Sequence, residues 1–136
     1  MPSETDLTAL LKNLNPIVLE DDYVFCSTNL SIAECLHLKP IATFHEQEGL
    51  TLVLTMKTAL ANNMVYESTF RCITLTVQSS LNAVGLTSAV ANILTQHNIS
   101  ANVIAAYYHD HVFVPSNRAE DALSALKDLS KSCITP

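Results

Sequence analysis

The chain has 136 residues, a hydrophobic content of 49%, a charged content of 15% and a net charge of −6 at pH 7. This length predicts one domain or two small halves that share a core, and the low content of charged residues indicates that part of the exterior is buried against another subunit. The acidic balance and the lack of any basic run exclude nucleic acid as an expected partner, because phosphate binding needs clustered lysine and arginine.

A short helix is predicted at the N-terminus. Ser3 and Asp6 resemble a capping box at its start, and Asn15-Pro16 ends it. One face of this helix carries four leucines at helical spacing, Leu7, Leu10, Leu11 and Leu14.

The rest of the first half alternates between strand-like and helix-like segments. Period-two alternation on both sides of Gly49 predicts a hairpin that turns at this glycine. In chain order, the predicted elements are a strand at 23–28, a loop or short helix at 29–39, strands at 41–46 and 50–54, and a short helix at 55–63.

The second half shows the same succession of patterns. Asn117 and Glu120 resemble a cap and its N3 partner for the last helix. In chain order, the predicted elements are one or two strands at 65–78, a helix with the stripe Leu86, Ala89, Val90, Ile93, Leu94 and His97, a strand at 101–108, a turn at 109–110, a strand at 111–115, a helix with the stripe Ala119, Ala122, Leu123, Leu126 and Leu129, and a closing strand at 132–135.

Both halves therefore follow the order β-α-β-β-α-β, which is that of a ferredoxin-like unit. We predict an α+β fold of two tandem units, with antiparallel sheets and with helices on one face. The predicted boundaries are residues 1–16 for the N-terminal helix, 17–70 for the first unit and 71–136 for the second.

Three segments carry a resemblance to a known family. They are "EGLTLVL" (48–54), "ITLTVQSSLNAVGLTSAV" (73–90) and "ISANVIAAYYHDHVFVP" (99–115). The chain resembles an uncharacterised bacterial family of ACT-domain proteins from residue 23 onward, most closely in its second half. The resemblance implies two tandem ACT-like units whose sheets pair side by side within or between chains. It also implies a regulatory role, since ACT domains typically bind amino acids.

A more distant resemblance suggests where a ligand would bind. The regulatory domain of phosphoglycerate dehydrogenases holds serine with two asparagines, and "NAVG" (82–85) and "NVIAA" (102–106) are similar to the segments that carry them. Val84 stands where that domain has proline. The ligand-binding residues that this resemblance implies are Asn82, Val84, Gly85, Leu86, Thr87, Asn102 and Val103.

The chemistry of these residue types suits a zwitterion. A helix that begins at Gly85 would offer the backbone N–H groups of Leu86 and Thr87 to a carboxylate. The amide of Asn82 both donates and accepts, and that of Asn102 accepts from an ammonium group. In the alternative interpretation, Gly85 only closes a tight strand-to-helix turn, with local hydrogen bonds from the side chains before it.

The sequence thus predicts a regulatory module that binds a small molecule, with an amino acid as the expected ligand. We expect a homodimer or a higher homo-oligomer, and neither a cofactor nor catalytic activity, because no nucleophile motif is present. A structural or protein-interaction module without a ligand is the alternative. A third reading, a metal site at His109, Asp110 and His111, lacks further ligands nearby in the sequence.

The cysteines and the apolar runs bear on location. The four cysteines form no C-x-x-C pair, and Cys26 and Cys72 fall within apolar strand-like runs. The N-terminus lacks the features of a signal peptide, and no apolar run reaches the length of a membrane span. We therefore expect a reduced, cytoplasmic protein without membrane contact.

Overall fold

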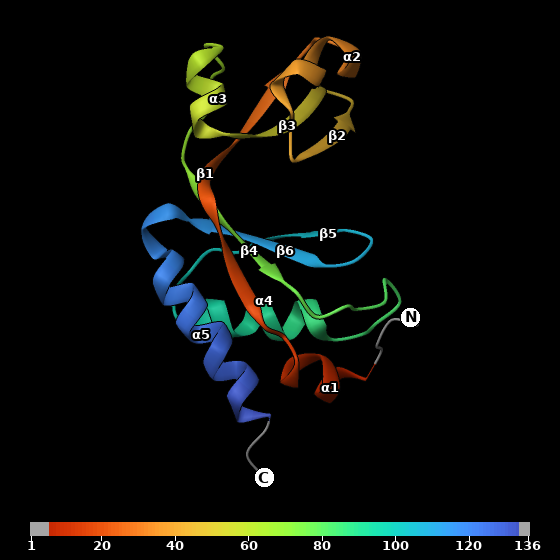
Figure 1. The fold of residues 1–136 in the computed structure, drawn as a ribbon, viewed down its shortest axis with the longest axis vertical. Coiled ribbons are helices and arrows are strands. Elements are labelled where there is room, and N and C mark those ends of the chain that lie inside the picture. Colours follow the sequence, from red (N-terminus) through yellow and green to blue (C-terminus); the bar gives the residue numbers. More distant parts are fainter. Residues whose placement is uncertain (1–5, 134–136) are drawn as a thin grey trace. The chain divides into compact units, whose positions relative to one another are not determined.

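The computed structural model describes residues 6–133, and the chain folds into two compact units (Figure 1). One unit, here called the discontinuous unit, combines Met1–Leu19 with Arg71–Pro136. The other, here called the inserted unit, is formed by Glu20–Phe70. The long strand β1, Pro16–Thr28, begins in the discontinuous unit and continues into the inserted unit.

The inserted unit is a small antiparallel sheet with two short helices. Its strand order is β2-β3-β1, and both neighbouring pairs are antiparallel. A capping box joins Ser31 and Glu34 at the start of α2, and the Thr55 side chain caps α3. Besides β1, the elements are α2 (Ile32–Cys35), a 3₁₀ turn (Leu36–Leu38), β2 (Ala42–Glu46), β3 (Gly49–Thr55) and α3 (Met56–Ala61).

The discontinuous unit follows the order β-α-β-β-α after its N-terminal helix. Its strand order is β1-β4-β6-β5, so that the first part of β1 occupies the place of the closing strand of a ferredoxin-like unit. The predicted α+β fold of ACT type is confirmed. The elements besides β1 are α1 (Leu7–Lys12), β4 (Phe70–Leu75), α4 (Leu86–Gln96), β5 (Asn102–Ala105), β6 (Asp110–Pro115), a 3₁₀ turn (Ser116–Arg118) and α5 (Ala119–Ser132).

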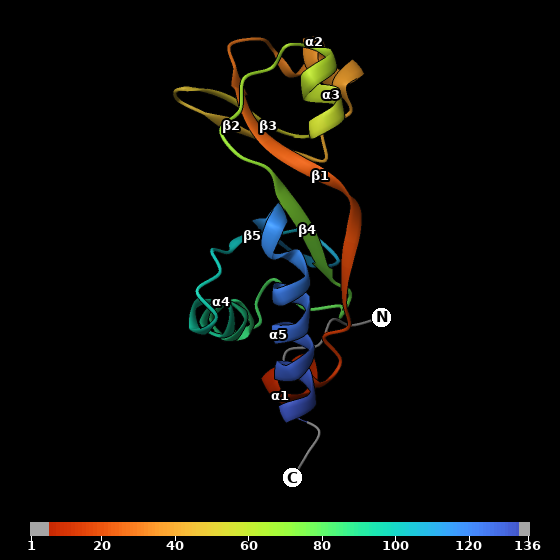
Figure 2. The same cartoon turned by 90° about the vertical axis from the view of Figure 1, so that its left-hand side faces the viewer.

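The core of the discontinuous unit lies between its strands and three helices. The axes of α4 and α5 cross, as is seen where α4 is viewed end-on beside α5 (Figure 2). The predicted apolar faces of β4, α4 and α5 supply most of this core, which is continuous with the leucines of α1. Its most deeply buried members include Leu10, Leu14, Ile73, Leu75, Val90, Leu94, Val112, Val114 and Leu126.

Two predictions of local structure near the C-terminus are wrong. Asn117 and Glu120 do not cap α5; its N-cap residue is Arg118, and no side chain provides a cap hydrogen bond. The closing strand predicted at 132–135 conflicts with Ser132, which is the last residue of α5, while residues 134–136 lie outside the described part of the chain. Ser3 of the predicted N-terminal capping box also lies outside it, but Asp6 caps α1 by accepting from the Thr8 N–H.

The β5–β6 hairpin turns earlier than the sequence predicts. The turn spans Ala106–His109, closed by the Ala106 N–H donating to the His109 carbonyl at 3.1 Å, and Asp110 already belongs to β6. Tyr107 and Tyr108 are at the tip, 77% and 59% exposed, with their rings in edge-to-face contact. Neither tyrosine packs in the core. Because the turn comes earlier in the chain than predicted, Asp110 is part of strand β6 and not of the turn.

Candidate functional site

The junction between β4 and α4 explains why a glycine stands at position 85. Gly85 is the N-cap residue of α4 and has φ +101°, a conformation that residues with a side chain rarely adopt. A Cβ added there would also lie 3.0 Å from Cδ2 of Leu7, which packs against the glycine from α1. The close approach that needs a bare backbone is therefore made by Leu7 on this side of the junction.

A small pocket opens at the other side of the same junction. It has a volume of about 80 Å³ and lies at the N-terminus of α4, which no side chain caps. The first N–H groups of a helix have no partners within the helix, and the helix dipole makes this end attractive to anions. The lining residues are Ser79, Ser80, Leu81, Ala83, Leu86, Thr87, Ala105 and Asp110.

Asp110 places a carboxylate in the wall of this pocket. Its neighbour across the β5–β6 ladder is Ala105, which lines the pocket as well. The hydroxyl of Ser79, a residue only 6% exposed, donates to Asp110 Oδ2 at 3.5 Å. Burial raises the pKa of Asp110, an effect that the Ser79 hydrogen bond and the charges of His111 and His109 oppose. A positive group in the pocket would relieve this cost of burial.

The histidines on either side of Asp110 bond to other partners. His111 Nδ1 lies 3.0 Å from the Thr74 hydroxyl, and His109 Nδ1 lies 3.2 Å from the Val77 carbonyl oxygen. Desolvation lowers the pKa of His111, helped by the charge of His109 and opposed by that of Asp110. Within residues 6–133, no three His, Cys, Asp or Glu side chains gather in a group that could hold a metal ion.

The predicted ligand-binding residues are only partly brought together. Leu86 and Thr87, the first two residues of α4, line the pocket, whereas Asn82, in the loop before α4, is exposed and does not. Asn102 pairs with Phe113 at the start of β5, three residues from the pocket-lining Ala105, which is about 10 Å along a strand. Three further predicted residues do not line the pocket: Val84, which is 83% exposed, Gly85 and Val103.

Several pocket residues escaped the sequence analysis. Ser79, Ser80 and Asp110 are not among the predicted ligand-binding residues, and Asp110 falls in the predicted turn at 109–110. In "DHVFVP" (110–115) the apolar residues begin only at Val112, so the sequence gives little sign that β6 already starts at Asp110. Its closeness to α4 depends on strand order, which no local pattern contains.

The fold and this pocket together define a class of protein. The strands and helices of ACT type are those of regulatory modules that bind small ligands, and the pocket lies where the first strand of such a unit turns into its first helix. The ACT-domain family matches the chain twice, at residues 2–71 and at residues 67–128. The chain belongs to the ACT-domain family.

Solved structures extend the comparison. A Vibrio cholerae protein of unknown function, described as a possible transport protein, is 49% identical with a TM-score of 0.85, covering 91% of this chain and 95% of that one. The ligand-free regulatory subunit of aspartate kinase from Thermus thermophilus is 7% identical with a TM-score of 0.62, covering 86% and 97%. An Agrobacterium tumefaciens protein is 15% identical with a TM-score of 0.66, covering 85% and 87%.

Two negative findings complete the comparison. No curated protein has significant similarity to the chain. Among residues 6–133, no helix combines the length and the apolar character that crossing a membrane requires.

Proposed function

We propose that this ACT-domain protein is an amino-acid-responsive regulatory module that binds its ligand at the N-terminus of α4. The observation that carries the proposal is the pocket in which an uncapped helix N-terminus faces a partly buried carboxylate. The α-carboxylate would accept from the N–H groups of Leu86 and Thr87, and the ammonium would donate to Asp110. One small cavity thus offers both of the opposite polarities that a zwitterion needs.

The size of the pocket supports the same ligand. A water molecule needs about 10–15 Å³, so the pocket of about 80 Å³ has room for about five to eight water-sized groups. An α-amino acid has five heavy atoms in its ammonium, α-carbon and carboxylate groups. A ligand side chain of more than about three heavy atoms would therefore extend toward the opening, where Leu81 is 67% exposed.

A homodimer would explain how Asn102 contributes. β5 is the last strand in the order of the discontinuous unit, so its outer edge can pair with another strand. Two copies of β5 can pair in antiparallel fashion with Val103 of one copy opposite Ile104 of the other. In this register, Asn102 of one copy lies opposite Ala105 of the other. Such a pairing brings an amide to each pocket. Ligand binding would then stabilise the dimer, which is how the module would act on a separate partner.

The cysteines agree with a reducing compartment. Cys26, Cys35, Cys72 and Cys133 are all free thiols. We therefore place the module in the cytoplasm, where thiols remain reduced. No catalytic step is part of the proposal.

Thermal unfolding in the presence of each of the twenty amino acids tests this function. A ligand at about a hundredfold excess over its Kd stabilises a protein by about 2.7 kcal/mol, which corresponds to a rise of several degrees in Tm for a chain of this size. We expect at least one amino acid to give such a rise, and Asp110→Asn to abolish it.

The matched control is Asp128→Asn. Asp128 is exposed on α5 and does not line the pocket, yet its replacement changes the net charge by the same amount. The control variant should respond to the amino acid as the unmodified protein does. If no amino acid raises Tm, or if both variants lose the response equally, the function proposed for this pocket is wrong.

A further inference from the structure

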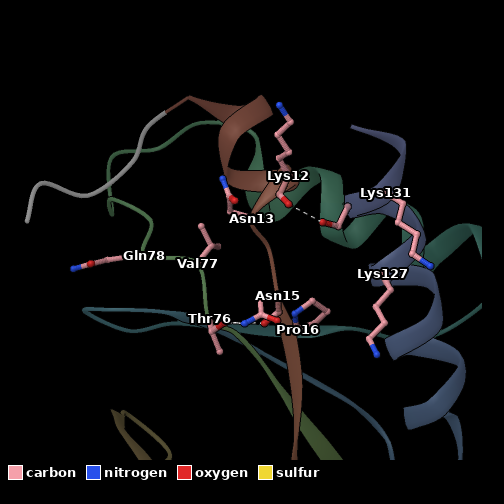
Figure 3. A pocket seen from close by; sticks show the side chains of 10 residues that line it. Lys12, Asn13, Asn15, Pro16, Thr76, Val77, Gln78, Lys127 and Lys131 are labelled. Atoms are coloured by element: carbon pink, nitrogen blue, oxygen red, sulfur yellow. Dashed lines mark hydrogen bonds between the residues drawn. The ribbon is translucent and has the colours of Figure 1, made fainter. Parts of the chain in front are cut away.

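A second and larger cavity lies in the discontinuous unit, away from the α4 N-terminus. Its volume is about 650 Å³, within the range of about 300–1,000 Å³ that is typical of small-molecule sites. It lies among the end of α1, the segment that leads into β1, the segment after β4, and α5 (Figure 3). The lining residues are Lys12, Asn13, Asn15, Pro16, Thr76, Val77, Gln78, Lys127, Ser130 and Lys131.

The charge of this cavity is opposite to that of the protein. Its wall contains Lys12, Lys127 and Lys131, three of the five lysines in a chain whose net charge is −6. None of the described residues that line it is acidic. Within residues 6–133, neither Lys12 nor Lys127 forms an ion pair. The ammonium groups of Lys12 and Lys127 therefore give the wall a local positive potential, which attracts anions into a concave site.

Hydrogen bonds fix the backbone around the cavity. The Asn15 amide donates to the Thr76 hydroxyl at 2.8 Å, and that hydroxyl donates to the Asn15 carbonyl at 2.8 Å. On the opposite side, the Ser130 hydroxyl of α5 donates to the Lys12 carbonyl of α1 at 3.1 Å. The walls are thus joined by bonds between residues far apart in the sequence, which favours a preformed site.

The lysine side chains remain adjustable within this fixed frame. Lys127 and Lys131 project from α5 on one side, whereas Asn13 and Gln78 lie on the other (Figure 3). The ammonium groups point in different directions, and Lys12 and Lys127 are exposed. Directing them at one ligand requires rotation of flexible stems and no change of the backbone.

We propose that this cavity binds a small organic anion that carries at least two negative charges, with phosphoryl groups as the preferred source. The donors left for a ligand are ammonium and amide groups, because the hydroxyls of Thr76 and Ser130 already donate to backbone carbonyls. No guanidinium lines the cavity to hold a planar carboxylate in bidentate fashion. Ammonium groups act as point charges, which suits the tetrahedral oxygens of a phosphoryl group. The module would then respond to two ligands. The anion would bind at a site that shares no lining residue with the amino-acid pocket.

Calorimetric titration with inorganic pyrophosphate tests the proposal, with citrate as the carboxylate of comparable charge and acetate as the monovalent control. The double variant Lys12→Gln/Lys127→Gln removes two cavity charges. The matched control, Lys39→Gln/Lys57→Gln, removes two exposed charges of the inserted unit, so that both proteins have the same net charge.

We expect saturable binding of pyrophosphate, and a Kd that rises about tenfold in the cavity variant but less than about twofold in the control. Acetate should not bind. Tighter binding of citrate than of pyrophosphate would keep the anion site and assign it to a polycarboxylate. The proposal is overturned if neither polyanion binds saturably, or if both double variants weaken binding equally. Asp110→Asn should leave pyrophosphate binding unchanged, which separates this site from the amino-acid pocket.

Discussion

Replacing Gly85 by alanine tests the backbone geometry on which the α4 N-terminus depends. At φ +101°, a residue with a Cβ is strained by about 1–3 kcal/mol. The new Cβ would also meet the Leu7 side chain at 3.0 Å, but the end of a leucine can move aside at little cost. Alanine restricts the unfolded chain and so returns about 0.4–1 kcal/mol. From the middle of these two ranges, the net loss in the free energy of unfolding should be about 1–1.5 kcal/mol.

Urea denaturation of four proteins would measure this loss and assign its cause. They are the unmodified chain, Gly85→Ala, Leu7→Ala and the double variant, which form a double-mutant cycle. Because most of the cost is expected in the backbone, Gly85→Ala should still lose at least about 1 kcal/mol when Leu7 is alanine. A stability within about 0.5 kcal/mol of the unmodified protein would refute the strain argument. A cost that vanishes in the Leu7→Ala background would show that packing, not φ, requires the glycine.

Three further predictions concern other parts of the discontinuous unit. The pKa of His111 is lowered in the folded protein, so this residue stabilises the fold above its unfolded pKa of about 6.5, and the stabilisation is lost as the pH falls through the folded pKa. Between about pH 7.5 and 5, the free energy of unfolding measured in urea should therefore fall more for the unmodified protein than for His111→Gln. Equal decreases in the two proteins would contradict this. Thr76→Val removes both hydrogen bonds that the Thr76 side chain makes with Asn15 and keeps the one from the Thr76 backbone N–H. It should cost about 1–2 kcal/mol in the same assay, whereas an unchanged midpoint of urea unfolding would mean that the two side-chain bonds add nothing. Burial raises the pKa of Cys72 to about 11, so iodoacetamide at about pH 8 should label Cys72 only after unfolding. Detection of labelled Cys72 in the native protein by mass spectrometry would disprove its burial.

Much of the fold can be predicted from local patterns, since the helical stripes of α4 and α5 and the predicted strands at β4 and β6 supply core residues as expected. The first part of β1 could not, because residues 16–22 end in three acidic residues and do not alternate regularly. Their strand conformation depends on a neighbour far along the chain, as the bonds from the Arg71 guanidinium to the Leu19 carbonyl illustrate. Non-local pairing of this kind leaves no local signal.

The two cavities show the same division between local and non-local information. The turn at Gly85 was identified from its sequence context, and Leu86 and Thr87 do line a pocket there. Asp110 reaches that pocket only through strand pairing and strand order. Likewise, the spacing of Lys127 and Lys131 places both on one face of a helix, but nothing in the sequence brings Lys12 to them.

The recognition of both ends of a zwitterion in the α4 pocket is most directly tested by calorimetric titration with three compounds. They are the amino acid that raises Tm most, its primary amide, which lacks the carboxylate, and its N-acetyl derivative, which lacks the ammonium. The helix N-terminus and Asp110 each require one of these charges, so both derivatives should bind at least about tenfold more weakly than the amino acid. Binding of either derivative as tightly as the amino acid would contradict the account.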